Sequence, residues 1–210
     1  MTDPRLLLAT TNAGKIREIR RSLKGLGLAV VGLDKAQPGL APRERGKTFS
    51  ANARSKALYY SRTWGGLTLA EDSGLEVEAL GGAPGVRSAR FSAPRPSDEK
   101  NNRKVLALLG DRPASGRRAR FVCVIALARR GRLLGEFRGQ VRGRIGFAPR
   151  GVNGFGYDPL FYYGPFRRTF AELSLAEKSS VSHRGRALRK LRSFLHKNKR
   201  FLSRDWGSPP

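Results

Sequence analysis

The sequence predicts an α/β protein, and three stretches support that prediction. Residues 5–10 form a short apolar run, and a polar loop and apolar residues at helical spacing follow, which is the pattern of strand, turn and helix. A second helical stretch precedes the apolar run 67–70. Residues 136–145 alternate polar and apolar side chains, as a half-buried antiparallel strand does. Strands that alternate with helices along one chain are typical of α/β architectures.

The length and composition indicate one folded domain. With 210 residues the chain can bury one good core, and we expect a domain over residues 1–200 and a C-terminal tail at 201–210. No long apolar run occurs, and the N-terminus lacks the pattern of a signal peptide, which favours a cytoplasmic protein. The single cysteine, Cys123, lies in an apolar run, so we expect a buried side chain rather than a nucleophile.

The net charge is +26, from 42 Lys and Arg against 16 Asp and Glu. A charge of this size favours polyanionic partners such as nucleic acids and nucleotides. Arginine is spread along nearly the whole chain, however, and charge alone does not define a site. A nucleic-acid-binding protein and a nucleotide-processing enzyme both remain open at this point.

Two adjacent acids, Glu71 and Asp72, follow the apolar run 67–70 and precede Ser73 and Gly74. Neighbouring carboxylates repel each other, and burial of either one without a partner is costly. Mg²⁺ is commonly held by one or two carboxylates together with substrate phosphates, so it would relieve that cost. Because neighbouring strand residues point to opposite faces, we expect the chain to leave strand geometry at Ser73 and Gly74 so that both acids reach one ion.

The loop after the first strand offers groups that bind phosphate. Asn12 supplies an amide, Lys15 a positive charge, and the helix that follows presents free N–H groups at its start. The spacing of a Walker loop is absent. An ordinary turn in which Asn12 caps the helix explains the loop equally well.

Four further helices are expected from their caps and periodicity. Thr48 is the expected cap of a helix to residue 62, on which Lys56 either points at a site or extends along the surface. Ser97 begins a helix to residue 109, and Ser174 with Glu177 forms a capping box for a short helix. The last helix is expected at residues 186–199, with His183 and Arg184 just before its N-terminus, where anions bind.

Two stretches between these helices carry strand and loop signals. Residues 118–128 read as a long strand that turns back at 129–131 as a hairpin. Residues 151–159 contain three glycines, two aromatics, an acid and a proline, which indicates a shaped loop. Phe155 either offers a flat face to a nucleotide base or fills the core together with Tyr157.

Seven short motifs occur in a fixed order along the chain. They are T-T-N-A-G-K at 10–15, T-F-x-x-N-A at 48–53, E-D-S-G-L at 71–75, G-G-A-P-G at 81–85, S-A-R-F-S at 88–92, G-F-G-Y-D-P at 154–159 and E-K-S-x-x-S-H-R-G at 177–185. Each alone is a weak signal, whereas the ordered set is specific. Over residues 6–195 it resembles the inosine/xanthosine triphosphate pyrophosphatase family, which acts on non-canonical purine nucleotides.

The resemblance implies an ITPase-like α/β fold, in which helices flank a long mixed β-sheet and form two lobes with a central cleft. It implies a homodimer that hydrolyses ITP, dITP and XTP to the monophosphate and pyrophosphate with Mg²⁺. Such an enzyme cleanses the nucleotide pool. Specificity is expected at purine C6, because a hydrogen-bond donor aimed there donates to a 6-oxo group and leaves a 6-amino group unpaired.

The resemblance also implies roles for individual residues. Asp72 resembles the general base, and Lys56 a lysine on the phosphate side. Glu44, Glu71 and Asp72 resemble metal-associated carboxylates. The residues that resemble substrate contacts are Thr10, Thr11, Asn12, Ala13, Gly14, Lys15, Ser73, Phe155, Gly156, Tyr157, Asp158, Lys178, His183 and Arg184.

Two positions depart from the family pattern. Glu71 stands where an aspartate is usual, so that carboxylate is one methylene longer. Ala51 stands where a glutamate is usual, which removes the reciprocal bond of a capping box, worth about 0.5–1 kcal/mol. Two alternatives stay open, namely a basic nucleic-acid-binding protein on the same scaffold and a pyrophosphatase for modified pyrimidine nucleotides.

Overall fold

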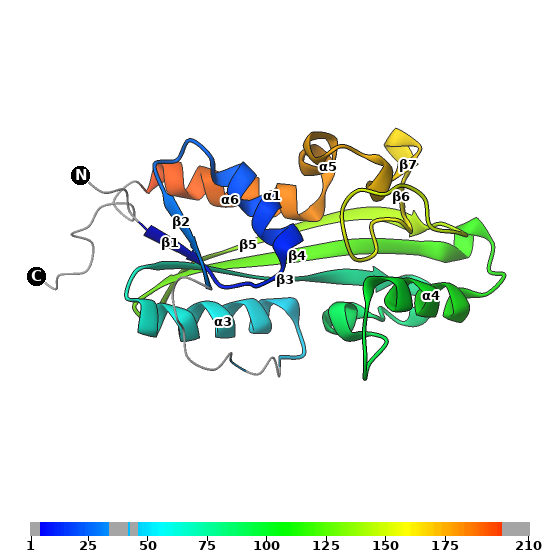
Figure 1. Ribbon diagram of the computed structural model, residues 1–210, viewed down its shortest axis with the longest axis horizontal. Coiled ribbons are helices and arrows are strands. Elements are labelled where there is room, and N and C mark those ends of the chain that lie inside the picture. Colours follow the sequence, from blue (N-terminus) through cyan, green and yellow to red (C-terminus); the bar gives the residue numbers. More distant parts are fainter. Residues whose placement is uncertain (1–4, 34–41, 43–45, 199–210) are drawn as a thin grey trace, which may run out of the picture. The chain divides into compact units, whose positions relative to one another are not determined.

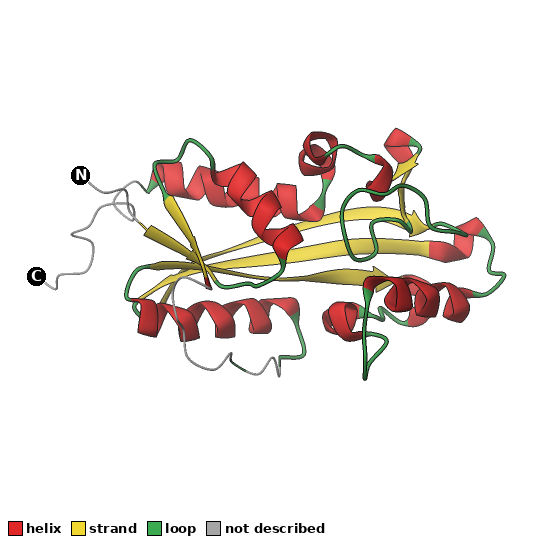
Figure 2. Cartoon of the chain, viewed as in Figure 1, coloured by secondary structure: helices red, strands yellow, loops and turns green. Residues whose placement is uncertain are grey.

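The computed structural model describes residues 5–33, 42 and 46–198 of the chain. Over these residues it has a seven-stranded mixed sheet flanked by helices, which confirms the predicted α/β class (Figures 1 and 2). The strands follow the order β2-β1-β3-β4-β5-β6-β7. Their bounds are Arg5–Leu8 for β1, Ala29–Gly32 for β2, Leu67–Val77 for β3, Arg118–Arg129 for β4, Arg132–Ile145 for β5, Phe161–Tyr163 for β6 and Arg168–Thr169 for β7.

The main helices are α1 (Ala13–Leu23), α3 (Phe49–Trp64), α4 (Asp98–Leu109), α5 (Leu175–Val181) and α6 (His183–Lys197). The chain divides into two compact units. Unit 1 contains the chain up to Asp72, residues 124–138 and the chain from Ala187 onwards. Unit 2 contains residues 73–123 and 139–186. Strands β3, β4 and β5 and helix α6 therefore contribute residues to both units.

Unit 1 is built on parallel strands. β1 pairs in parallel with β2 on one side and with β3 on the other. Because crossover connections between parallel strands are right-handed, α1 and α3 lie on opposite faces of these strands, and α6 shares the face of α1 (Figure 1). The carboxyl ends of β1 and β3 form a topological switch point, the place where open α/β sheets bind ligands.

Unit 2 is built around an aromatic core. Phe121 of β4 contacts Phe161 with ring centroids 4.6 Å apart, and it stacks on Phe170 at 6.0 Å. Val105 and Leu109 of α4 are buried in the same cluster. Tyr157 also belongs to this core, where its hydroxyl donates to the Ser88 carbonyl at 2.9 Å, and burial raises the pKa of that hydroxyl.

Several local predictions are confirmed. β4 and β5 are joined at Arg130 and Gly131, which both have positive φ as a tight hairpin turn requires. Phe137, Val141 and Ile145 of β5 are buried, as their alternation with polar residues predicts. Cys123 is buried. The hydroxyls of Thr48, Ser97 and Ser174 cap α3, α4 and α5, and Ser174 forms the full capping box with Glu177.

Two predictions are wrong. β3 does not leave strand geometry at Ser73 and Gly74 but continues to Val77, since the apolar residues Leu75 and Val77 are buried in unit 2. The last helix begins at His183 rather than at residue 186, because the Ser182 hydroxyl accepts a hydrogen bond from the Gly185 amide at 3.1 Å and so caps an earlier start. None of the described helices is long and apolar enough to span a membrane.

Candidate active site

The candidate residues of unit 1 lie at the switch point. The Ala9 amide donates to the Leu69 carbonyl at 2.8 Å, which brings the end of β1 level with β3 just before Glu71 and Asp72. Both carboxylates are almost completely buried, at 1% and 6% exposure. Such burial demands partners of opposite charge or hydrogen-bond donors, because an isolated buried carboxylate would take up a proton.

The two acids have different partners. Glu71 Oε1 lies 3.3 Å from Lys15 Nζ on α1, and Asp72 Oδ2 accepts from Asn52 Nδ2 on α3 at 2.9 Å. Lys56, also on α3, donates its ammonium to the Glu71 backbone carbonyl at 2.8 Å. Since α1 and α3 cover opposite faces, these contacts place the two carboxylates on opposite sides of β3. They therefore do not converge on one ion in the way the sequence suggested.

The loop after β1 is shaped around Asn12. Its Oδ1 accepts from the Lys15 backbone amide at 2.9 Å and thereby caps α1, while the Asn12 backbone amide donates to Thr10 Oγ1 at 3.2 Å. This geometry is compatible with both interpretations of the loop, the helix cap and the phosphate-binding loop. The Asn12 cap also fixes the orientation of the free N–H groups at the start of α1. Of the residues predicted here, Thr11, Asn12 and Ala13 are exposed, whereas Thr10, Gly14 and Lys15 are half-buried.

Glu44 lies outside the described residues, so its predicted role stays a prediction. Within the part of the chain that the structure describes, no cluster of three or more His, Cys, Asp and Glu side chains is suited to a metal ion. Mg²⁺ needs few protein ligands, because it keeps several waters and shares its coordination between one or two carboxylates and substrate phosphates.

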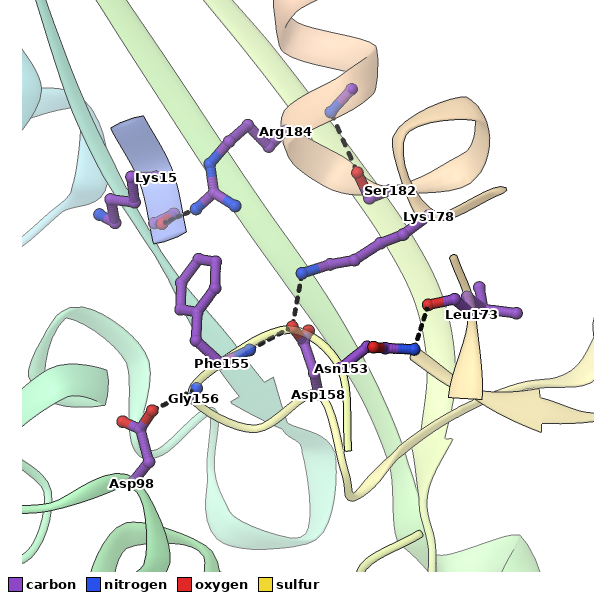
Figure 3. A network of polar contacts seen from close by, with 12 residues as sticks. Lys15, Asp98, Asn153, Phe155, Gly156, Asp158, Leu173, Lys178, Ser182 and Arg184 are labelled. Carbon is purple, nitrogen blue, oxygen red and sulfur yellow. Dashed lines mark hydrogen bonds and ion pairs between the residues drawn. The ribbon is translucent and has the colours of Figure 1, made fainter. Parts of the chain in front are cut away.

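The candidate residues of unit 2 are centred on the loop that carries Phe155. Asp158 is 2% exposed, and its Oδ2 accepts from the Phe155 amide at 2.9 Å and from the Lys178 ammonium (Figure 3). Gly154 allows the Asp158 carboxylate to lie this close to the loop backbone, because a Cβ at that position would lie 2.1 Å from Asp158 Oδ2. The glycine therefore allows the close approach that the sequence pattern indicated.

Two cations surround the half-buried ring of Phe155. Lys178 Nζ lies 4.7 Å and Arg184 Cζ 5.3 Å from the ring centroid. Arg184 is 1% exposed, and it donates to the Ser73 hydroxyl at 3.1 Å. Lysine and arginine are donors only, so the surroundings of this ring favour hydrogen-bond acceptors on a bound group.

The other two predicted residues of unit 2 lie in the core. His183 is 3% exposed, and its ring stacks on Phe121 at 4.6 Å with an interplanar angle of 12°. Tyr157 is buried as described above. Of the two aromatics in the loop, Phe155 thus keeps a partly accessible ring, while Tyr157 fills the core.

Helix α4 contributes two residues that the sequence did not identify as part of the site. Asp98 Oδ2 accepts from the Gly156 amide at 2.6 Å (Figure 3). Asn102 Nδ2 donates to the Gly156 carbonyl at 2.9 Å. Both polar groups of Gly156 are thus held by one helix, next to Phe155. The sequence offered Asp98 only as an acid in the first turn of a helix, where acids are common for electrostatic reasons.

Arg117 anchors the beginning of the same loop. Its guanidinium is buried and donates to the carbonyls of Ile145 and Gly146, both at 3.1 Å, and to that of Gly110 at 2.9 Å. It thereby joins the end of α4 to the end of β5. Burial lowers the pKa of this guanidinium, which nevertheless stays charged because the carbonyls replace its water.

The family model that matches the chain is that of the Ham1 family, over residues 6–194. The chain belongs to the Ham1 family. Curated relatives agree with this assignment. The dITP/XTP pyrophosphatase of Gloeobacter violaceus is 50% identical over 188 residues, which cover 90% of this chain and 92% of that protein. A protein of the same name from Syntrophobacter fumaroxidans is 50% identical over 186 residues, covering 89% of this chain and 79% of that protein.

Solved structures of Ham1 proteins share the fold. A HAM1 protein from Coxiella burnetii superposes with a TM-score of 0.84 at 38% identity, covering 92% of this chain and 99% of that chain. A dITP/XTP pyrophosphatase from Mycobacterium abscessus gives a TM-score of 0.72 at 40% identity, covering 89% of this chain and 97% of that chain. Membership of the Ham1 family thus rests on both sequence and structure.

Proposed function

We propose that this protein is a nucleoside triphosphate pyrophosphatase that hydrolyses dITP, ITP and XTP to the monophosphate and pyrophosphate. The observation that carries the base preference is the pair of cations, Lys178 and Arg184, beside the Phe155 ring. Family membership supports the reaction, since the relatives named above are dITP/XTP pyrophosphatases.

We assign the triphosphate to the unit 1 residues. Lys15 and Lys56 supply positive charge, and the N–H groups at the start of α1 are oriented by the Asn12 cap. Charge develops on the phosphate oxygens during attack of water on the α-phosphorus, and such preorganised cations stabilise it. Asp72 orients or deprotonates the attacking water, and the bond from Asn52 fixes the position of its carboxylate.

The donor set fits Mg²⁺ bound together with the nucleotide. Asp72 would hold the ion, and Glu44, outside the described residues, is a second candidate ligand. When bound, the ion would neutralise phosphate charge and lower the pKa of water. Glu71 was also predicted as a metal ligand, but its ion pair with Lys15 supports a role in positioning that lysine.

We assign the purine base to the unit 2 residues. Phe155 offers an aromatic face for stacking, and Lys178 and Arg184 donate to an oxygen at C6. Adenine presents a 6-amino donor there, which would place a donor against these donors and is rejected for that reason. Guanine also carries a 6-oxo group, so its rejection must arise at C2.

Two further properties belong to this proposal. The protein acts in the cytoplasm on the nucleotide pool, and it acts as a homodimer, as the family resemblance implies. Light scattering of the purified protein tests the second property, since a monomer mass at micromolar concentration would contradict it. A pyrophosphatase for modified pyrimidine nucleotides is the alternative enzyme, and a substrate panel separates the two.

The test is pyrophosphate release from dITP, XTP, dATP, dGTP and a modified pyrimidine triphosphate, each with and without Mg²⁺. We expect rapid release from dITP and XTP that requires Mg²⁺, and release from dATP and dGTP slower by about 10²-fold or more. Equal rates with dATP would contradict the assignment of the base site. Preference for the pyrimidine substrate would contradict the purine assignment while leaving the reaction intact.

A further inference from the structure

The side chain of Asn52 joins two segments of unit 1. Asn52 lies near the start of α3 and is 1% exposed. Its Oδ1 accepts a hydrogen bond from the Gly46 backbone amide at 2.8 Å, and its Nδ2 donates to Asp72 Oδ2 at 2.9 Å. One buried carboxamide therefore connects the chain just before α3 to a carboxylate of β3.

The Gly46 amide determines which way round the Asn52 carboxamide lies. A carboxamide oxygen only accepts hydrogen bonds and its nitrogen only donates them, whereas a backbone N–H is a donor alone. The Gly46 amide therefore has to face Oδ1, which turns Nδ2 toward Asp72. The flipped carboxamide would set donor against donor at Gly46 and acceptor against carboxylate at Asp72, and buried polar groups without partners are costly. The backbone before α3 thus ensures that Asp72 meets a donor.

This arrangement depends on the absence of a side chain at Gly46. A Cβ at that position would lie 2.4 Å from Asn52 Oδ1 and 2.9 Å from the Cβ of Ala51. Both distances are shorter than the contacts that real Cβ atoms make, so a larger residue would displace the Asn52 side chain or the backbone that holds it. The glycine is therefore needed for the close approach of its amide to Asn52.

A second buried asparagine, Asn101 of α4, provides a comparison. It is 2% exposed, and its Oδ1 accepts from the amide and the hydroxyl of Ser92, both at 2.8 Å. Its Nδ2 donates to the Ala89 carbonyl at 3.3 Å. These partners are backbone groups and a hydroxyl, to which no role in the reaction was assigned. Asn52 differs because one of its two partners is the carboxylate assigned to the attacking water.

We propose that Asn52 is a positioning residue for pyrophosphate release, and that the Gly46 amide sets its orientation. An aspartate side chain rotates about two bonds, and the hydrogen bond from Asn52 Nδ2 restricts that rotation at Asp72. A general base has to lie within hydrogen-bond reach of the proton that it removes, so a carboxylate that turns away costs rate rather than substrate binding. The inference rests on the proposed function, which assigns the attacking water to Asp72.

The first experiment compares Asn52→Ala with Asn101→Ala in steady-state turnover of dITP. We expect Asn52→Ala to lower kcat by about 10–10²-fold and to leave KM within about threefold, because the groups assigned to phosphate and base remain. Asn101→Ala removes another buried, hydrogen-bonded carboxamide and should keep kcat within about threefold. Both variants should melt at lower temperature than the wild type. Equal losses of kcat in the two variants would overturn the proposal, since both would then report general loosening.

A double-mutant cycle with Asp72→Asn tests whether Asn52 acts through Asp72. We expect Asn52→Ala to change kcat by less than about twofold in the Asp72→Asn background, where the base is already lost. A further fall of about tenfold or more in that background would overturn the proposal, because Asn52 would then act on another group. Turnover of Asp72→Asn close to that of the wild type would instead contradict the proposed function, and this inference with it.

Replacement Gly46→Ala disturbs the arrangement while both side chains remain. The added Cβ should displace the Asn52 carboxamide and lower kcat by about 5–20-fold, with KM again within about threefold. Gly164→Ala is the control, because a Cβ at Gly164 would meet no described atom within 4 Å beyond its chain neighbours. Its kcat should equal that of the wild type. A wild-type kcat in Gly46→Ala would overturn the role of Gly46.

Hydrogen exchange of the Gly46 amide gives a readout that does not depend on activity. We expect this amide to exchange slowly in the wild type and at least about tenfold faster in Asn52→Ala, as measured by NMR. An unprotected Gly46 amide in the wild type would overturn the proposed orientation of Asn52. If the wild type releases no pyrophosphate from dITP, the proposed function fails, whereas the exchange result still confirms or overturns the bond that orients Asn52.

Discussion

The candidate residues of unit 1 and those of unit 2 are assembled in different ways. In unit 1 the carboxylates of Glu71 and Asp72 are consecutive, and their partners lie on the helices that follow β1 and precede β3. In unit 2 the ring of Phe155 is held through groups from separate stretches of chain, on α4, α5 and α6. In our proposal, the unit 1 residues place charge with respect to phosphate, and the unit 2 residues place donors with respect to a base.

This difference implies that the two parts fail differently when they are altered. Loss of a group in unit 1 removes stabilisation of the reacting phosphate for every substrate. Loss of a group in unit 2 changes binding of the base or the order of the loop. The predictions below test that division, from the largest expected effect to the smallest.

Replacement Asp72→Asn should have the largest effect. Asparagine can still accept the hydrogen bond from Asn52, so the fold and the thermal midpoint should be kept. The negative charge that orients or deprotonates water is lost, and kcat for dITP should fall by about 10²–10⁴-fold. Steady-state kinetics and a melting curve measure both effects, with Asp111→Asn, an exposed acid of unit 2, as the control. Turnover close to that of the wild type would remove Asp72 from the mechanism.

Replacement Lys178→Met tests the buried ion pair of unit 2. The side chains of Lys178 and Asp158 are 4% and 3% exposed, so the substitution leaves the Asp158 carboxylate buried without its cation. We expect a loss of about 3–5 kcal/mol in the free energy of unfolding, measured by urea denaturation. The double variant Lys178→Met, Asp158→Asn should recover most of that loss, because the asparagine is neutral and still accepts from the Phe155 amide. No recovery would show that the lysine stabilises the loop in another way.

Replacement Asp98→Ala tests the hold of α4 on Gly156. Loss of the bond to the Gly156 amide should loosen the backbone next to Phe155 and raise KM for dITP about 5–20-fold, with kcat changed less than about threefold. Asp98→Asn keeps an acceptor and should restore KM to within about threefold. Glu99→Ala removes the other acid of the first turn of α4 and serves as the control for helix electrostatics. An equal rise in KM for Glu99→Ala would contradict the positioning role.

Replacement Glu177→Gln should give the smallest effect, which depends on pH. The Ser174 amide and the Arg168 guanidinium donate to the Glu177 carboxylate and lower its pKa from 4.5 to about 2. A depressed pKa adds stability that is present above about pH 4.5 and is lost as the pH falls toward 2. The thermal midpoint of the wild type should therefore fall further than that of the variant over that range. Equal falls in the thermal midpoints of the wild type and the variant from pH 5 to pH 2.5 would show that the capping box does not contribute.

The sequence predicted the unit 1 part more completely than the unit 2 part. Caps, strand ends and the paired acids are local signals, and Asn12 and Thr48 cap their helices as predicted. The continuation of β3 past Ser73 was missed because it depends on Leu75 and Val77 entering the core of unit 2.

The contacts around Phe155 could not be derived from local pattern. Asp98 lies 58 residues before Gly156, and its position in a first helical turn already had a sufficient explanation. His183 looked like an anion-binding residue, although it stacks on Phe121 in the core. The family resemblance identified the loop, but the residues that fix its backbone emerge only from the fold.

The most direct test of the division between the two parts is the ratio of kcat/KM for dITP to that for dATP. It is measured for the wild type, for Lys56→Met in unit 1, and for the double variant Lys178→Met, Asp158→Asn in unit 2. We predict that Lys56→Met lowers both rates and keeps the ratio within about threefold, since phosphate contacts are common to both substrates. The double variant should lower the ratio by about tenfold or more, because it removes a donor to the 6-oxo group. A ratio that falls in Lys56→Met and is preserved in the double variant would contradict the assignment of phosphate to unit 1 and base to unit 2.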